Sequence, residues 1–106
     1  MSDDEKLEKS GPEIVLPDSE EFKIRLQKRL GDISAELKDL RAIYKYSAPE
    51  MFSRWNIEIM LLEKLLTDGR VDTWDLSREY AHKHGSITDN FGVICMRIDD
   101  ECKAVA

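Results

Sequence analysis

The sequence has few cysteines, prolines and glycines. Its only cysteines, Cys95 and Cys102, would sit about 10 Å apart on one helix, which is too far for a disulfide. We therefore predict two free, buried thiols. Three prolines and five glycines, with 42% apolar and 36% charged residues, are typical of a globular helical chain and argue against disorder throughout.

The chain also lacks an excess of positive charge and a long apolar run. Its 16 basic and 22 acidic residues give a net charge of −6, which repels nucleic acid and anionic lipid unless the cations gather on one face. The most apolar stretch, 52–66, is interrupted by Glu58, Glu63 and Lys64 and falls short of the roughly 20 residues of a membrane span. Residues 1–9 lack the pattern of a secretory signal. We expect a cytoplasmic protein without a membrane partner.

Familiar catalytic motifs are missing as well. There is no G-x-S-x-G, no glycine-rich phosphate loop and no H-E-x-x-H. Carboxylates are abundant, but none can be singled out without a cleft. The sequence therefore predicts a protein that is not an enzyme, with no catalytic residue and no cofactor.

Two patterns suggest metal sites, and both are incomplete. His82 and His84 point to different sides of a helix, and the cysteines lack the close spacing of structural zinc sites. The stretch 68–75 follows the second half of an EF-hand calcium loop, but Lys64 and Leu66 occupy the first and third ligand positions. We predict no metal.

A long first helix is predicted over residues 18–46. Asp18, with Glu21 three residues later, has the spacing of a capping box. An apolar seam follows with alternating spacings of four and three, and Gly31 lies within it as the point where a break is most expected. The seam either packs on the next helix of the same chain or forms a dimer; its residues are Leu26, Leu30, Ile33, Leu37, Leu40 and Tyr44.

A central second helix is predicted over residues 50–68. Ser47 to Glu50 again has capping-box spacing. Two neighbouring apolar stripes widen its hydrophobic arc, which is typical of a helix covered on two sides. The stripes are Phe52, Trp55, Ile59, Leu62 and Leu66 in one, and Met51, Leu61 and Leu65 in the other.

Two shorter helices complete the chain, over residues 73–84 and 89–104. Gly69 and Gly85 suit the left-handed conformation that ends helices, and Asp72 or Thr73 is expected to cap the third helix. The stretch 91–98 is rich in apolar and β-branched residues, so a short strand is the alternative there.

The N-terminal residues 1–17 are predicted to be a disordered acidic tail that carries a short apolar island at residues 13–17. This island is an extended segment docked on the body, a linear motif for a partner, or the lead-in to the first helix. Residues 18–106 form a single helical domain in this prediction. The fold class is all-α, a bundle-like arrangement of four helices.

The function that this composition favours is non-catalytic protein binding, as an adaptor, a chaperone or an assembly or regulatory subunit. The large apolar residues exceed what such a short third helix can cover, and exposed patches of that kind mark interfaces. The partner is another protein or a second copy. The candidate partner-binding residues are Tyr44, Phe52, Trp55 and Trp74.

The alternative is a helix-turn-helix regulator that binds DNA directly or through a partner, built on residues 71–98. Ala81 and Gly85 are four apart, as in that motif. The last helix, however, begins and ends with acidic residues and offers phosphate only Arg97 and Lys103. Nucleic acid is therefore the less favoured partner.

Overall fold

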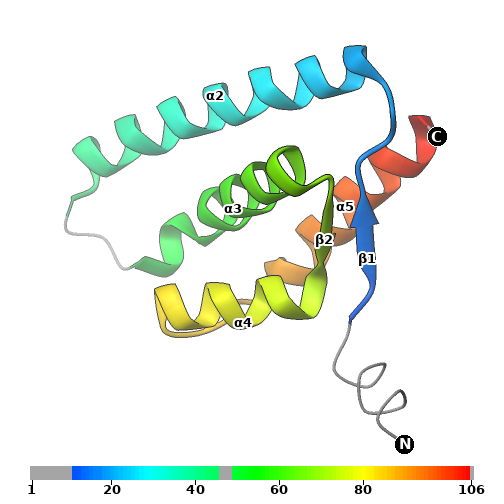
Figure 1. The fold of residues 1–106 in the computed structure, drawn as a ribbon. Coiled ribbons are helices and arrows are strands. Elements are labelled where there is room, and N and C mark those ends of the chain that lie inside the picture. Colours follow the sequence, from blue (N-terminus) through cyan, green and yellow to red (C-terminus); the bar gives the residue numbers. More distant parts are fainter. Residues whose placement is uncertain (1–10, 46–48, 106) are drawn as a thin grey trace, which may run out of the picture.

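The computed structural model describes residues 11–45 and 49–105, which form a mainly α-helical fold with a small two-stranded sheet (Figure 1). The prediction of a mainly helical chain is confirmed. Strand β2, by contrast, was not predicted. In chain order the elements are β1 (Glu13–Val15), α2 (Glu20–Ile43), the 3₁₀ turn η1 (Pro49–Phe52), α3 (Ser53–Asp68), β2 (Arg70–Asp72), α4 (Thr73–His84) and α5 (Asn90–Val105).

Helix α3 lies at the centre of the described structure, with α2 along one side and α4 and α5 on the other (Figure 1). Four of its side chains have no exposed surface: Ile57, Leu61, Leu62 and Leu65. The buried centre differs from the first predicted stripe, because Trp55, Ile59 and Leu66 are only partly buried. Covering α3 from two sides removes most of its apolar surface from water, which stabilises the fold by about 25 cal/mol per Å².

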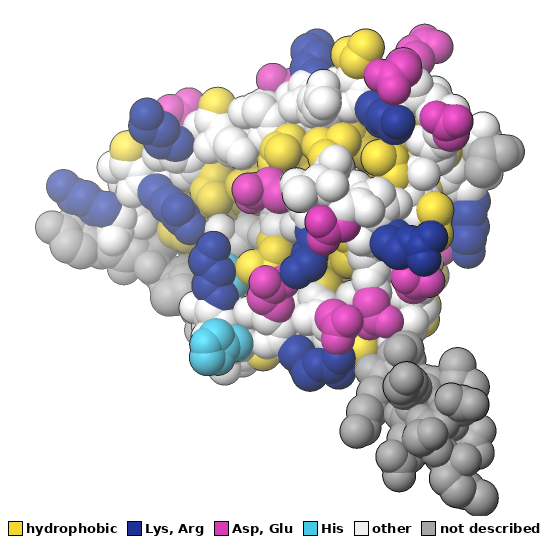
Figure 2. Space-filling model, viewed as in Figure 1, with side chains coloured by type: hydrophobic (Ala, Val, Ile, Leu, Met, Phe, Trp, Pro, Cys, Tyr) yellow, Lys and Arg dark blue, Asp and Glu magenta, His cyan; other side chains and the backbone are white. Residues whose placement is uncertain are grey.

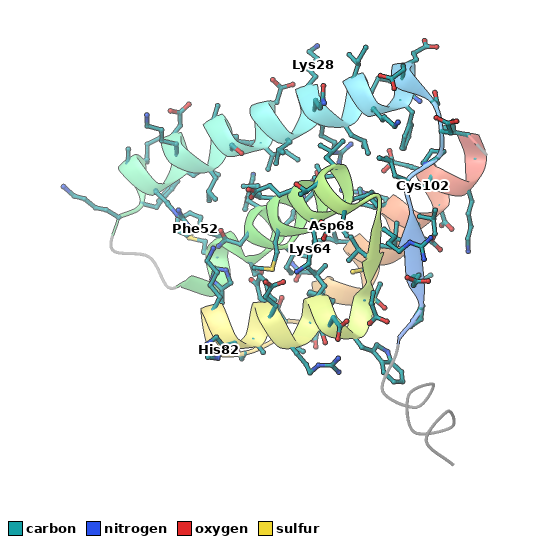
Figure 3. The ribbon with its side chains drawn as sticks, viewed as in Figure 1. Lys28, Phe52, Lys64, Asp68, His82 and Cys102 are labelled. Carbon is teal, nitrogen blue, oxygen red and sulfur yellow. The ribbon has the colours of Figure 1, made fainter. Side chains whose placement is uncertain are left out.

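Helix α2 packs lengthwise on the rest of the chain. Leu26 and Leu37 are buried, and Leu30 and Ile33 pack against the core. This is the intrachain packing that the sequence offered as one alternative. The solvent side of the helix carries charged residues such as Lys28, whose side chain points away from the body (Figure 3).

The ends of α2 correct two details of the prediction. The N-cap is Ser19, not Asp18, since the Ser19 Oγ accepts a hydrogen bond of 3.2 Å from the Phe22 amide. The helix ends at Ile43, so the prediction that it continues is wrong for Tyr44 and Lys45, and residue 46 lies outside the described residues. Gly31 does not break the helix. It is an exposed residue of α2, and the backbone stays helical on both sides of it.

Strands β1 and β2 form an antiparallel ribbon in which Ile14 pairs with Val71. These two side chains point inward and are 1% and 2% exposed, while Val15 points outward. The ribbon confirms that the apolar island is an extended segment docked on the body. Residues 1–10 of the predicted tail lie outside the described residues.

Caps define the two C-terminal helices. Asp72 Oδ1 accepts hydrogen bonds of 3.0 Å from the amides of Trp74 and Asp75, so the Asp72 alternative is confirmed. Gly69 and Gly85 have φ of 81° and 91° and end α3 and α4 in the left-handed conformation, as predicted. The strand alternative for residues 91–98 is wrong, because α5 is helical throughout and buries an apolar face.

A buried carboxylate links α2, α3 and α5. Glu58 on α3 is 3% exposed, and its Oε2 accepts a hydrogen bond of 2.6 Å from Arg29 Nε on α2. Its other oxygen pairs with the Arg97 guanidinium on α5. Burial opposes ionisation of Glu58, but the hydrogen bonds from both arginines outweigh it and lower the pKa of Glu58. The charge of Glu58 on α3 therefore joins this helix to α2 and α5.

Candidate functional site

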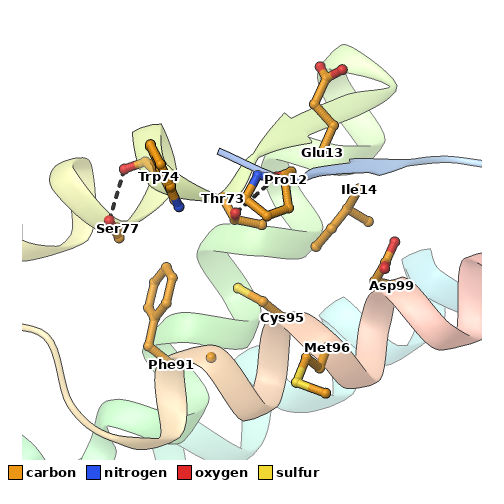
Figure 4. A pocket seen from close by; sticks show the side chains of 11 residues that line it. Pro12, Glu13, Ile14, Thr73, Trp74, Ser77, Phe91, Cys95, Met96 and Asp99 are labelled. Atoms are coloured by element: carbon orange, nitrogen blue, oxygen red, sulfur yellow. Dashed lines mark hydrogen bonds between the residues drawn. The ribbon is translucent and has the colours of Figure 1, made fainter. Parts of the chain in front are cut away.

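An apolar groove of about 340 Å³ opens between β1, the first turn of α4 and one side of α5 (Figure 4). Strand β1 contributes one wall and α5 contributes the floor, while Trp74 from α4 stands at one end. Asp99 adds an acidic side chain to the lining, whereas the side chain of the other acidic lining residue, Glu13, points to the far side of β1 (Figure 4). The apolar lining residues are Pro12, Ile14, Trp74, Phe91, Cys95 and Met96.

The position of Trp74 is fixed by contacts at the start of α4. The backbone amide and the Oγ1 of Thr73 both donate to the Pro12 carbonyl oxygen, at 2.9 and 2.8 Å. The Gly11 amide donates to Asp72 Oδ2 at 2.9 Å. Hydrogen bonds from backbone amides lower the pKa of Asp72, and the amide of Asp75 has the largest effect. The chain before β1 is thus tied to the cap of α4, beside the groove.

Gly11 is required by the close approach of the Trp74 ring. A Cβ atom at position 11 would lie 2.3 Å from the Cγ of Trp74, which is far below any van der Waals contact. A larger residue at position 11 must therefore displace the ring or the segment. The wall of the groove near Trp74 depends on this glycine.

Large apolar side chains remain exposed around the groove. Trp74 is 45% exposed, Met96 is 68% exposed and Val93, one turn before Met96 on α5, is 66% exposed. Charged side chains of both signs dominate much of the face in Figure 2, with hydrophobic side chains visible between them. A cluster of exposed apolar residues that borders a concave surface is typical of an interface.

The four predicted partner-binding residues are not brought together. Trp74 lines the groove, whereas Tyr44 follows the end of α2, 46% exposed, at the opposite end of the molecule from β1 (Figure 1). Phe52 is buried, at 8% exposed, and it precedes the start of α3, away from the groove (Figure 3). Trp55 is partly buried and lines a separate hollow of about 180 Å³ between α2 and α3.

Sequence reasoning missed the residues that join Trp74 at the groove, chiefly Ile14, Cys95 and Met96. One signal for the exposed side of α5 was present. Val93 and Met96 fall outside the apolar stripe formed by Phe91, Ile94 and Ile98. Large apolar residues off the buried stripe of a helix indicate a surface kept free of charge.

Cys95 and Cys102 are free and buried, which confirms the prediction for the thiols. Burial raises the pKa of both thiols to about 11, from an ordinary 9.0. For Cys102, the nearby carboxylates of Asp99 and Glu101 add to this effect. Because the thiolate is the reactive form, both groups are expected to be inert near neutral pH.

We expect a chromogenic disulfide reagent at pH 8 to modify the native thiols at least roughly 100-fold more slowly than the thiols of the urea-unfolded chain. The factor follows from the raised pKa, and burial of the sulfur atoms slows the reaction further. The measurement is the absorbance of the released thiolate with and without denaturant. Equal rates in the two states would show that the thiols are not protected.

Across residues 11–45 and 49–105, no three or more His, Cys, Asp or Glu side chains lie close enough to hold a metal ion. None of the helices in this part of the chain combines the length and the apolar character needed to cross a membrane. Comparisons with protein-family models, with curated proteins and with solved structures gave no significant match to this chain.

Proposed function

We propose that this chain is a small non-catalytic protein-binding module, serving as an adaptor, a chaperone or an assembly or regulatory subunit, and that the groove is its binding site. The observation that carries the proposal is a concave apolar surface whose lining includes the exposed side chains of Trp74 and Met96, with exposed Val93 one turn before Met96 on α5. Burying such side chains against a partner contributes about 1.5–3 kcal/mol each when burial is complete. Tryptophan and methionine are also enriched at the centres of protein interfaces.

The walls of the groove support this proposal because they are held in place by the fold. Ile14 is anchored in the core, the start of α4 is capped, and the floor belongs to a helix with a buried apolar face. The bundle-like packing of helices expected from the sequence would supply the rigid support. A site built on rigid elements loses little conformational entropy when a partner binds. A cytoplasmic location stays a prediction from the sequence.

The charges on α5 favour a protein partner over DNA. Along α5, which the structure describes from end to end, Arg97 is paired with buried Glu58, and Lys103 Nζ lies 2.9 Å from Asp99. The other exposed side chains include Val93, Met96 and the acidic Asp100. A helix that reads DNA needs cations or hydrogen-bond donors at these positions, and an apolar and acidic surface repels phosphate.

The proposal can be tested by selecting peptides from a displayed random 12-residue library on the immobilised protein. We expect the enriched peptides to bind the Met96→Asp variant at least about tenfold more weakly, a loss of roughly 1.4 kcal/mol, because a carboxylate placed in the groove must be desolvated. The dissociation constants are measured by fluorescence polarisation.

Met51→Asp is the matched control. Met51 is 52% exposed, like Met96 a solvent-facing methionine, but it lies on η1, outside the groove lining. Peptides should bind this variant as they bind the parent protein. The proposal fails if no peptide is enriched, or if the two variants lose affinity equally.

A further inference from the structure

Strand β1 has one backbone edge that faces away from β2. The Leu16 amide donates to the Gly69 carbonyl oxygen, and the Thr73 amide donates to that of Pro12, each at 2.9 Å. Hydrogen-bonded pairs alternate in an antiparallel ladder, so the next such pair is Ile14 with Val71. The backbone groups of Glu13 and Val15 therefore point to the other side of β1.

That outer edge is open in the described part of the chain. Glu13 and Val15 are exposed, and no hydrogen bond outside the ladder reaches the backbone of either residue from the residues that the structure describes. Unpaired amide and carbonyl groups on a strand edge are a template for another extended segment. Val15 supplies one outward N–H and one outward C=O, and so does Glu13.

The open edge borders the apolar groove. Pro12, Glu13 and Ile14 form the groove wall opposite α5, so a chain laid along the outer edge of β1 also runs beside the groove (Figure 4). Alternate side chains of a strand point to the same side, about 6.6 Å apart. At least one apolar side chain of such a segment can then enter the space between Trp74, Phe91 and Met96.

The charges of the groove indicate the chemistry of the segment. Glu13 and Asp99 are its charged lining residues, and neither lysine nor arginine is among the described residues that line it. Their surface partners are Arg70, at 3.8 Å from Glu13, and Lys103, and exposed ion pairs of this kind contribute about 0–1 kcal/mol. A basic side chain that a bound segment points into the groove would meet Asp99, while Glu13 points to the other side of β1, and the existing pairs of both carboxylates are weak (Figure 4).

We propose that the groove takes an extended segment of another protein, which pairs as an added strand with the outer edge of β1. The segment places an apolar side chain in the groove and a lysine or arginine near Asp99. This inference rests on the proposed function and names its binding mode and the chemistry of its partner. Strand addition is an established mode of peptide recognition, in which main-chain hydrogen bonds give affinity and pockets for alternate side chains give specificity.

The first test compares Val15→Pro with Val15→Ala, using the peptides selected on the parent protein. Proline removes the outward amide of residue 15 and leaves the ladder with β2 intact, since edge strands accept proline where the N–H faces solvent. We expect Val15→Pro to weaken binding at least about tenfold, while Val15→Ala, which keeps the amide, changes it less than about threefold. Circular dichroism and urea unfolding check that both variants fold.

The second test does not depend on the folding of a variant. Each amide of the best selected peptide is N-methylated in turn, and binding to the parent protein is measured. Strand pairing predicts that affinity falls at every second position, because alternate amides face β1. A helical segment in the groove would show no such period of two.

The outcomes separate this inference from the proposed function. If peptides bind the groove but neither the proline variant nor the methylation series shows the expected pattern, strand addition is overturned and protein binding stands. If no peptide is enriched, the proposed function fails, and this inference, which rests on it, fails with it. If the parent protein sediments as a dimer and Val15→Pro sediments as a monomer, the occupant is a second copy of this chain, which also overturns the inference.

Discussion

Replacing Glu58 by glutamine is expected to lower the free energy of unfolding by about 3 kcal/mol, the low end of what removal of one partner from a buried ion pair costs. Glutamine keeps the shape of the side chain but leaves Arg29 and Arg97 without their common countercharge. The low end applies because both arginine side chains are 37% exposed and can recover some hydration. Urea unfolding at pH 7 measures the change.

The pH dependence gives this prediction a second readout. The pKa of Glu58 is lowered in the folded state, so its ionised form contributes stability above its ordinary value of 4.5, and that contribution is lost as the pH falls through the lowered pKa. The difference between the parent protein and Glu58→Gln should therefore shrink below about pH 4. A difference that stays constant with pH would show that the charge of Glu58 is not involved.

Exposed Glu63 on the same helix provides the control for this experiment. No ion pair or hydrogen bond joins its side chain to any described residue. Glu63→Gln removes the same charge from α3 and should change stability by less than about 0.5 kcal/mol. If the two variants are equally destabilised, the effect comes from net charge and not from the contacts of Glu58.

Truncating Ile14 to alanine should be about as costly, at about 3 kcal/mol, within the range of roughly 2–5 kcal/mol for buried isoleucine or leucine. Ile14 is 1% exposed and is the inward side chain of β1, so its loss leaves a cavity between the ribbon and α5. The same change should weaken peptide binding, because Ile14 lines the groove. Thermal and urea unfolding measure the stability of the variant.

The neighbouring residue is a matched control for this substitution. Val15 lies on the same strand but points outward and is 52% exposed, so Val15→Ala should change the free energy of unfolding by less than about 0.5 kcal/mol. Equal losses at both positions would mean that β1 is not docked with Ile14 facing inward. Only a docked strand makes two adjacent residues differ so strongly.

The helices were predictable because their signals are local. The turn at Gly69 and Asp72 was visible from two residues that each need a particular backbone geometry or hydrogen bond. The apolar seam of α2 likewise follows the period of a helix, and it continues through Gly31. Such patterns depend on residues within a few positions of one another, which a sequence shows directly.

The ribbon and the groove were not predictable in the same way. Strand β2 contains only Arg70, Val71 and Asp72, too short for a period of two to be recognised, and its partner lies far away in the sequence. The buried charge of Glu58 was read as an interruption of an apolar run, since its arginine partners come from two other helices. Trp74 was predicted to lie at the binding surface, but the groove beside it was not predicted. Its neighbours there, Ile14 and Met96, come from elements that are distant in the sequence.

The pairing of β1 with β2 and its packing on α5 have a consequence for how the protein matures. The strand that forms the wall of the groove is synthesised before the helix that forms its floor, so a growing chain has no groove until α5 has left the ribosome. Bringing β1 and α5 together closes a long stretch of chain, which costs conformational entropy. The burial of Ile14 and the contacts around Pro12 must offset that cost. Detachment of β1 alone would also abolish the site while the helices stay folded, so binding of a partner reports on whether β1 is docked.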